Sequence, residues 1–204
     1  MTKRKQSRHR DSRRLGVNLW GGKSSVEKRN YPPGMHGTKG YGRSTDYGVQ
    51  MKAKQQLKKY YGDVTEKQFH GIYKKSVRLK GNTESNLIGL LESRLDAIVY
   101  RAGFVPTIFA ARQFVNHYHV LVDGHPVNIP SYSVKEGSVV TVQENSRTIA
   151  MVSESVKLSE GKAPNYIEIS DNGYSAKFVK QPELSEVPYP VNMQPRLVIE
   201  YYSR

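Results

Sequence analysis

Residues 111–132, ARQFVNHYHVLVDGHPVNIPSY, predict an α-helix that leads directly into a β-hairpin. Alternating apolar residues flank Asp123-Gly124, and an Asp-Gly pair in this setting is a strong signal for a two-residue hairpin turn. Thr107 lies at the position expected for the helix cap. The side of the helix that faces the interior is expected to comprise Ile108, Ala111, Phe114, Val115 and Tyr118.

A polar face runs along the same predicted helix. Arg112 and Gln113 are followed one turn later by Asn116 and His117, and this spacing places all four side chains on one side of a helix. A guanidinium group offers a planar fork to phosphate, while amides and imidazole add hydrogen bonds of fixed reach. The face alone is equally compatible with a solvated helix surface, so the rest of the chain has to decide between these interpretations.

The positive charge is concentrated at one end of the chain. The 204 residues carry a formal net charge of +14, and residues 1–60 contain 16 Lys and Arg against 3 Asp and Glu. Residues 61–150 contain 10 against 8, and residues 151–204 contain 6 against 7. This uneven distribution indicates a polyanionic partner, most simply a nucleic acid. An anionic membrane fits less well, because the basic end has no Trp/Phe/Leu face to bury in lipid.

Composition also restricts the class of protein. There is no cysteine, which removes disulfides, cysteine-type zinc sites and thiol nucleophiles. No run approaches 18 apolar residues, so a membrane-spanning helix is not expected. The N-terminus lacks the apolar core of a secretory signal, and a mitochondrial presequence is disfavoured because no apolar face precedes Leu15. A reducing, cytosol-like compartment is expected.

The first 45 residues are predicted to be extended and irregular. Seven glycines and the pair Pro32-Pro33 leave no room for a long helix. Trp20, Tyr31 and Tyr41 are more than a flexible linker needs. We therefore expect this segment to become ordered against a partner.

Helices are predicted over residues 46–61, 65–81 and 83–103. Asp46 is the expected cap of the first, and Thr65 with Gln68 forms a capping box for the second. The third has a strong apolar face and is long enough to be broken in two. The exposed side of the first helix is expected to carry Lys52, Lys54, Lys58 and Lys59.

Strands are predicted in the second half of the chain. GSVVTVQ at 137–143 and NYIEISDNGYSAKFVK at 165–180 have strand-like patterns, and the second contains a turn signal at Asn172-Gly173. PRLVIEYYSR at the C-terminus is interpreted as a further strand or extended piece. Together with the helices, these segments predict an α+β fold.

No catalytic motif stands out. GTKGYG at 37–42 matches neither glycine-rich phosphate-loop pattern, and there is no nucleophile elbow. His117 and His119 offer two nitrogens to a metal, but no third ligand is nearby. Glu92 and Asp96 have helical i, i+4 spacing and are interpreted as an ordinary charged face rather than a carboxylate pair. No cofactor and no metal are expected.

RNA is favoured over DNA as the polyanion. The sequence has no helix-turn-helix cue, zinc-finger pattern or basic zipper. An extended basic segment beside a compact module suits an irregularly folded RNA, in which such segments exchange their counterions for phosphates.

Longer blocks of the sequence resemble one known family. LLESRLDAIVYRAGF and ARQFVNHYHVLVDGHPVNIPSYSVKEGSVV are similar to the RNA-binding module named after small-subunit ribosomal protein S-four. That module also occurs in pseudouridine synthases, tyrosyl-tRNA synthetases and a heat-shock RNA-binding protein. SRRLGVNLWG, NYPPGMHG, DYGVQMKAKQQLKKYYG, EKQF, GNTESNLIGLLESRLD and LVIEYYSR resemble the ribosomal family's own blocks in the same order. The resemblance covers essentially the whole chain.

The resemblance implies two domains. A mostly helical domain would be completed by the C-terminal segment, with an RNA-binding module of helices packed on a small antiparallel sheet inserted in it. The expected divisions are an extended basic segment at 1–45, a helical domain at 46–92 completed by about 185–204, and the module with a following β-rich region at 93–184.

The resemblance also implies a function. Members of the family are structural constituents of the small ribosomal subunit that bind the 5′ domain of its rRNA, nucleate assembly and influence translational accuracy together with small-subunit protein five. They lie near the path by which mRNA enters the subunit, and some repress their own message. A cytoplasmic ribosome is the expected location, with an organellar ribosome left open.

The chain departs from the family at several positions. It lacks the zinc-binding cysteines of many members and therefore resembles the zinc-free branch. Ile108 and Ala110 stand where members often have Arg and Glu, and His125-Pro126 stand where basic residues are common. The candidate RNA-binding residues are Lys3, Arg4, Lys5, Arg8, Arg10, Arg13, Arg14, Arg43, Lys52, Lys54, Lys58, Lys59, Arg94, Arg112, Gln113, His117, His119, Asn128 and Tyr132.

Two rival interpretations share the same module. An RNA-modifying enzyme such as a pseudouridine synthase needs a catalytic domain for which no residues remain. A free-standing RNA chaperone of the heat-shock type has the module but lacks the SRRLGVNLWG and NYPPGMHG blocks.

Overall fold

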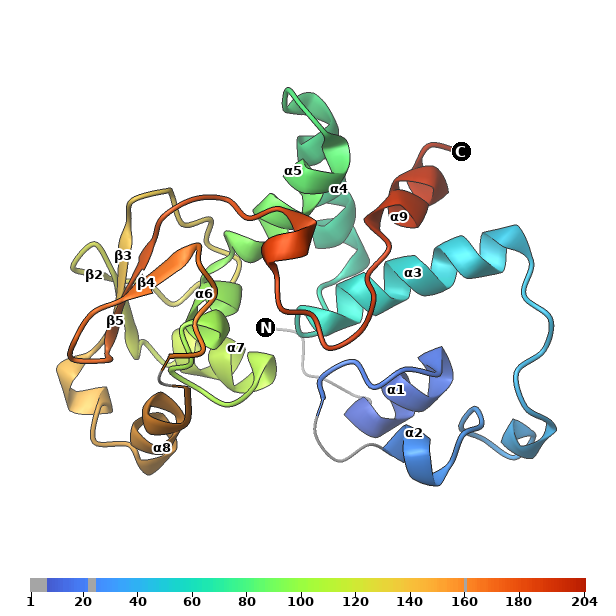
Figure 1. The fold of residues 1–204 in the computed structure, drawn as a ribbon, viewed down its shortest axis with the longest axis horizontal. Coiled ribbons are helices and arrows are strands. Elements are labelled where there is room, and N and C mark those ends of the chain that lie inside the picture. Colours follow the sequence, from blue (N-terminus) through green and yellow to red (C-terminus); the bar gives the residue numbers. More distant parts are fainter. Residues whose placement is uncertain (1–6, 22–24, 160) are drawn as a thin grey trace. The chain divides into compact units, whose positions relative to one another are not determined.

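The computed structural model describes residues 7–21, 25–159 and 161–204. In this part of the chain it contains nine α-helices, three short 3-10 helices and one five-stranded sheet, so the predicted α+β class is confirmed. The chain forms two compact units (Figure 1). Unit 1 comprises residues 1–71 with 189–204, and unit 2 comprises residues 72–188. The division expected between residues 92 and 93 falls inside unit 2.

The N-terminal part of unit 1 is more regular than predicted. It contains α1 (Arg8–Leu15), α2 (Ser25–Lys28) and the 3-10 helix Gly37–Lys39. Gly16 ends α1 with a φ of 73°, and its N–H donates to the carbonyls of Ser12 and Arg13. The sequence predicts an extended, irregular segment over residues 1–45, and the structure shows short helices within its described part. The glycines prevent a long helix, but Gly16 acts as the C-terminal cap of an eight-residue one.

The centre of unit 1 is the packing of α3 (Asp46–Tyr60) against α9 (Pro195–Tyr202), which lie side by side in Figure 1. Thr45 rather than Asp46 caps α3, because its side chain accepts a hydrogen bond from the backbone N–H of Gly48. The prediction of a C-terminal strand is wrong. Pro195 begins a helix there, and Val198 is fully buried.

Most lysines of α3 take part in internal ion pairs, in contrast to the exposed face that was predicted. Lys54 is only 5% exposed, and its Nζ lies 2.8 Å from Glu66 and 4.1 Å from the ring centre of Tyr201. Lys58 Nζ lies 3.1 Å from the same Glu66 carboxylate, and Lys59 Nζ lies 2.9 Å from Asp11. Lys54 is buried because α9 and the first turn of α4 cover that side of α3.

The division between the two units falls within α4 (Glu66–Arg78), so its C-terminal half belongs to unit 2. Four further helices form much of unit 2. They are α5 (Thr83–Glu92), α6 (Leu95–Arg101), α7 (Ile108–Asn116) and α8 (Ala150–Ser159), accompanied by the 3-10 helices Glu144–Ser146 and Leu184–Glu186. The predicted break in the segment 83–103 is confirmed, since the helix stops at Ser93-Arg94 and restarts. α8 was not predicted.

The sheet of unit 2 is antiparallel throughout, in the order β2-β1-β3-β5-β4. Its strands are β1 (Val120–Val122), β2 (His125–Pro126), β3 (Val139–Val142), β4 (Ile167–Ile169) and β5 (Ser175–Phe178). Pro126 lies in edge strand β2, where its missing N–H costs no ladder bond. Val120, Val122, Val140 and Val142 are buried on one face, whereas the alternating residues are more exposed. Both predicted strand segments are confirmed.

Two carboxylates that were interpreted as part of a charged surface are completely buried. Glu92 and Asp96 are both 0% exposed, and each is paired with an arginine. Arg101 donates to both carboxylate oxygens of Glu92 at 3.0 and 2.9 Å, and the Tyr166 hydroxyl donates to Glu92 at 2.8 Å. The interpretation was wrong because Leu91 and Leu95 extend the apolar face around these two positions.

Replacing Glu92 by Gln is expected to destabilise the protein by about 3–5 kcal/mol, because Arg101 would keep its charge in a buried site without a carboxylate. Urea unfolding at neutral pH measures this. Glu154→Gln, on the exposed side of α8, is the matched control and should change stability little. Equal stabilities of the two variants would contradict the assignment of the pair.

The hydrogen bonds around Glu66 are expected to make the free energy of unfolding depend on pH in the acidic range. Burial raises the pKa of Glu66, but hydrogen bonds from Lys54, Tyr202 and Lys58 outweigh it and lower the pKa from 4.5 to about 2. A carboxylate whose pKa is lowered by folding stabilises the fold above pH 4.5, and this contribution disappears as the pH falls from about 4.5 to about 2.

Glu66→Gln is therefore expected to lower stability at pH 7 by about 1 kcal/mol, since the carboxylate is half exposed. The variant should also lose less stability than the parent between pH 4.5 and 2. Unfolding free energies across that range test this prediction. If the unfolding free energies of variant and parent fall in parallel between pH 4.5 and 2, these hydrogen bonds do not lower the pKa of Glu66.

Candidate RNA-binding surface

The helix and hairpin predicted from residues 111–132 form the centre of the candidate site. Thr107 caps α7, and its hydroxyl oxygen accepts from the backbone N–H of Ala110 at 3.1 Å. Arg112 and Asn116 are partly exposed, whereas Gln113 and His117 are exposed. The Asn116 side-chain amide donates to the carbonyl of Arg112 at 2.6 Å. The predicted polar face is therefore present on the surface of unit 2.

The hairpin turn holds the two strands beside α7 in a fixed register. Asp123 and Gly124 both have positive φ, at 49° and 81°, as a two-residue turn with matching twist requires. The Asp123 carboxylate accepts from the backbone N–H of Val139 at 2.8 Å, and this hydrogen bond lowers the pKa of Asp123. β1 is thereby fastened to β3 as well as to β2.

The two histidines at the C-terminal end of α7 have different environments. His119 is half-buried, its Nδ1 lies 2.8 Å from the hydroxyl of Ser146, and its ring centre lies 4.8 Å from that of Phe114. Burial lowers the pKa of His119, and the neighbouring His117 lowers it further. The lowered pKa favours the neutral form of His119 near pH 7. His117, in contrast, is exposed on the surface. Within the described ranges no His, Asp and Glu side chains group into a three-ligand metal site.

Tyr118 lies outside the helix and does not face the interior, contrary to the prediction. Its φ is 62° and its side chain is 52% exposed. The chain turns sharply here to enter the hairpin, and this turn directs the ring outward. Asn128 donates to the Tyr118 hydroxyl at 2.7 Å, so two hairpin-side polar groups are held together. Tyr132 is 40% exposed, and its carbonyl accepts from the N–H of Leu95 at 2.9 Å.

Asp96 holds two arginines beneath this surface. Arg94 donates to its two carboxylate oxygens at 2.9 and 2.6 Å, and Arg94 is only 4% exposed. The Nε of Arg112 lies 3.9 Å from Asp96 on the same side, although 19% of the Arg112 side chain stays exposed. Asp96 is thus a positioning residue that sequence analysis missed. The position of an acidic residue within the apolar repeat of 87–99 is the signal that indicates it.

The candidate residues of unit 1 differ in their exposure and in their contacts within the protein. Arg13 donates to the carbonyls of Tyr31 and Pro32, both at 3.2 Å, and Lys52 lies over the ring of Tyr41. Lys3, Arg4 and Lys5 lie outside the described residues, and nothing is described of the side chain of Arg8. Among the candidates of this unit whose side chains the structure describes, Arg10, Arg14 and Arg43 are exposed.

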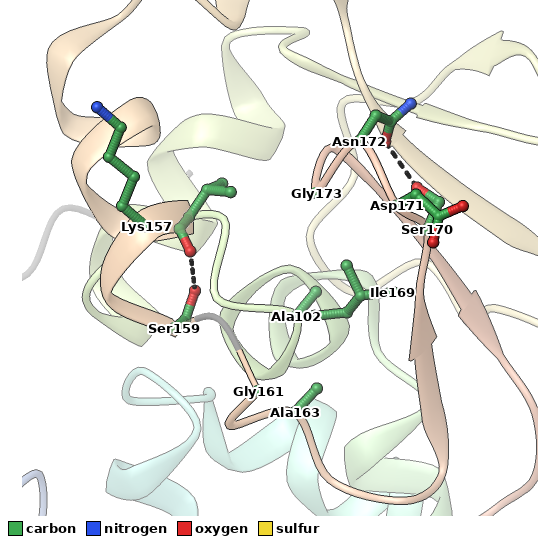
Figure 2. Close-up of a pocket in the computed structure, with 11 residues that line it drawn as sticks. Ala102, Lys157, Ser159, Gly161, Ala163, Ile169, Ser170, Asp171, Asn172 and Gly173 are labelled. Atoms are coloured by element: carbon green, nitrogen blue, oxygen red, sulfur yellow. Dashed lines mark hydrogen bonds between the residues drawn. The ribbon is translucent and has the colours of Figure 1, made fainter.

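A pocket elsewhere in unit 2 is lined mainly by small and polar residues among those that the structure describes. It lies between the end of α8 and the β4–β5 turn, and Figure 2 shows the residues that line it. Ser159 donates to the carbonyl of Val156, and Ser170 donates to Asn172 (Figure 2). Both hydroxyls are therefore used in local hydrogen bonds.

Comparison with known proteins identifies the family of this chain. Residues 3–92 match the family described as "Ribosomal protein S4/S9 N-terminal domain", and residues 93–140 match the "S4 domain". The chain is also 58% identical over its full length to the whole of small ribosomal subunit protein uS4 from Azorhizobium caulinodans.

The chain belongs to the uS4 family of ribosomal proteins. The uS4 proteins of Phenylobacterium zucineum and Ruegeria pomeroyi are 57% and 56% identical to it, again over the full length of both chains. The resemblance seen in the sequence is thereby confirmed. The helix α7, the hairpin and the first half of β3 all lie within the part that matches the S4 domain. In the described portion, no helix is both long enough and apolar enough to cross a lipid bilayer.

Asp96→Asn is expected to release Arg94 and Arg112 from their common anion. The variant should lose about 3 kcal/mol of stability, as when one partner of a buried pair is removed. Its arginine Nε–H signals in NMR spectra should also move and exchange faster with water. Asp171→Asn, in the exposed β4–β5 turn, is the control. Unchanged Nε–H signals in Asp96→Asn would exclude the positioning role.

Proposed function

We propose that this protein is a structural constituent of the small ribosomal subunit that binds the subunit's rRNA directly. The observation that carries the proposal is the exposed polar face of α7, with Arg112, Gln113 and His117, inside the segment that matches the S4 domain. Arginine and the amide suit phosphates and 2′-hydroxyls, and neither needs a particular base.

The N-terminal segment contributes sequence-independent affinity. Arg10, Arg14 and Arg43 are exposed, and the tail from Lys3 to Arg8 adds further cations. Each phosphate that a lysine or arginine neutralises releases counterions, which is the main source of non-specific RNA affinity. Lys54, Lys58, Lys59 and Arg94 belong to internal ion pairs, so the proposal gives them no direct contact.

The finer parts of the function rest on the family resemblance. We propose that the RNA target is the 5′ domain of the small-subunit rRNA, that binding nucleates subunit assembly, and that a contact with small-subunit protein five affects translational accuracy. A location near incoming mRNA, on a ribosome in the cytoplasm, follows from the same reasoning. The names of the full-length relatives support the subunit and the ribosome.

A structural role is favoured over the two rival functions. An RNA-modifying enzyme carrying the S4 domain would have its catalytic residues outside that domain. Residues 3–92, however, match a ribosomal family, and the relatives align from end to end. A free-standing RNA chaperone would need no such N-terminal match. Co-sedimentation with intact small subunits at high salt distinguishes a constituent from a transient binder.

Substituting Arg112 and His117 together by Ala is expected to weaken binding to a 5′-domain rRNA fragment by about ten- to a hundredfold. Loss of the Arg112 contact should lower the slope of log affinity against log salt by about 0.7–0.9. Filter binding or fluorescence anisotropy at several salt concentrations measures both effects.

The control for this experiment is Lys177→Ala, an exposed cation on β5. Thermal unfolding should be nearly unchanged in both proteins. Undiminished affinity of the Arg112/His117 variant would show that the α7 face is only solvated. A salt-independent affinity of the unmodified protein would rule out the electrostatic mechanism altogether.

A further inference from the structure

The turn between β4 and β5 contains a reactive pair of residues, Asn172 and Gly173. The sequence has ten asparagines, and Asn172 is the one that is followed by glycine. An asparagine amide can react with the backbone nitrogen of the next residue to form a five-membered ring, and a side chain on that next residue hinders the attack. Because glycine has no Cβ, this hindrance is smallest at Asn172.

The turn exposes this pair of residues to water. The Asn172 side chain is exposed, and Gly173 has a φ of 72°, in the left-handed region that glycine adopts without strain. The turn is closed by a hydrogen bond from the N–H of Ser170 to the carbonyl of Ser175 at 2.9 Å. Water therefore reaches the Asn172 side chain without any opening of the β4–β5 pair.

Two hydrogen bonds hold the side-chain oxygen of Asn172. Its Oδ1 accepts from the Ser170 hydroxyl at 2.6 Å and from the backbone N–H of Tyr174 at 3.0 Å. The Ser170 hydroxyl oxygen lies farther, at 3.1 Å, from the carbonyl oxygen of Ser175, so Asn172 is its nearer acceptor. Donors on a carbonyl oxygen stabilise the negative charge that this oxygen gains when a nucleophile attacks the carbon. The turn therefore makes the Cγ of Asn172 more susceptible to attack.

The side-chain nitrogen of Asn172 is the leaving group of this reaction. Nδ2 donates no hydrogen bond to any described residue, and Figure 2 shows it pointing away from Ser170. The Nδ2 atoms of Asn116 and Asn128, in contrast, donate to other residues at 2.6 and 2.7 Å. Ammonia can therefore leave directly into water from Asn172, whereas at the other two positions a hydrogen bond has to break first.

One hydrogen bond in the turn opposes the reaction. The N–H of Gly173 donates to the carbonyl of Ser170 at 2.8 Å, and this nitrogen has to lose its proton before it can attack. A single backbone hydrogen bond at the surface slows such a step by about tenfold at most. The bond therefore delays the reaction and does not prevent it.

We propose that Asn172 is a self-modification site that deamidates spontaneously, with water as the co-reactant. Hydroxide takes the proton of the Gly173 N–H, the nitrogen forms a bond to Cγ of Asn172, the Cγ–Nδ2 bond breaks, and ammonia leaves with a proton from water. Water then opens the cyclic succinimide by breaking one of its two carbonyl–nitrogen bonds and returns a proton to the nitrogen of Gly173. The products are aspartate and isoaspartate at position 172, each with one additional negative charge. The reaction does not depend on the proposed RNA-binding function.

The isoaspartate product is incompatible with the packing of this turn. Its main chain runs through Cγ and is therefore longer by one methylene group between positions 172 and 173. A Cβ added at Gly173 would lie 2.8 Å from Cγ1 of Val156, so the turn already packs closely against α8. The extra length has to disturb either this packing or the pairing of β4 with β5. Aged protein should therefore contain a fraction with a less stable unit 2.

The first test incubates the folded full-length protein in mildly alkaline buffer and follows it by peptide mapping with mass spectrometry. Asn172 should convert from amide to carboxylate at least about tenfold faster than Asn116 and Asn128, whose leaving groups are hydrogen-bonded and whose following residues carry side chains. N172Q should lose the reaction, because glutamine would need a six-membered ring. Equal rates at the three asparagines would overturn the inference. So would a rate at Asn172 more than about tenfold below that in guanidinium-unfolded protein, since the turn would then be protective.

The second test is Ser170→Ala, which removes one of the two donors to the Asn172 amide. Deamidation should slow by about two- to fivefold, because the developing charge on Oδ1 loses a hydrogen bond. Ser185→Ala, at an exposed position of the 3-10 helix Leu184–Glu186, is the matched control and should leave the rate unchanged. An unchanged or higher rate in Ser170→Ala would show that the turn does not activate the amide.

The third test compares the modified protein with N172D. Ion exchange separates the aged fractions by charge, and fragmentation spectra distinguish isoaspartate from aspartate. N172D has the same charge as the isoaspartate fraction without the longer main chain, so it is the matched control for packing. The isoaspartate fraction should have a Tm about 2–4 °C below that of N172D. Equal Tm values would show that the longer main chain is accommodated in the turn and would overturn the predicted loss of stability.

Discussion

The turn between α5 and α6 depends on two carboxylates that are completely removed from water. Glu92 ends α5 and is matched by Arg101 and the Tyr166 hydroxyl, while Asp96 begins α6 and is matched by Arg94. A buried charge without its partner costs several kcal/mol, so these helices have few alternative arrangements. Arg101 also donates to the carbonyl of Pro188, which fixes the chain where it leaves unit 2. The ion pairs of Glu92 and Asp96 therefore fix α5 and α6 relative to each other, and Arg101 also holds the chain at Pro188.

Asp96 connects these buried ion pairs to the candidate RNA-binding surface, because it lies beside both Arg94 and Arg112. The carboxylate of Asp96 lies 3.9 Å from the Nε of Arg112 and restrains this side chain without enclosing it, since 19% of the Arg112 side chain stays exposed. The hairpin is fixed by equally local means, through the Asp123-Gly124 turn and the hydrogen bond between Asp123 and Val139. A platform of this kind presents few charges, and each charge has a defined position. The N-terminal segment carries many more cations than this surface does.

Net charge alone does not identify which cations are available to RNA. The first third of the chain contains most of the excess, yet Lys54, Lys58 and Lys59 are paired with carboxylates of the fold. Residues 61–150 are nearly neutral in total, but their basic residues include Lys74 and Arg78, which are exposed on α4. Desolvation separates the two groups. A lysine beside a buried or half-buried carboxylate has already exchanged water for a partner, whereas Lys74 and Arg78 have not.

The sequence by itself determined the elements whose signals are local: the α7 helix with its Thr107 cap, the Asp-Gly hairpin and the α+β class. It also determined the family, because blocks along the whole chain match in order. Only the tertiary structure decided that PRLVIEYYSR is a helix, that Tyr118 faces outward, and that Lys54 and Asp96 are buried. Caps and turns are set by hydrogen bonds between residues a few positions apart, so they can be read from neighbours. Burial of an amphipathic or charged residue depends on a surface supplied by a distant segment, as α9 supplies one to α3, and no local pattern records which segment that will be.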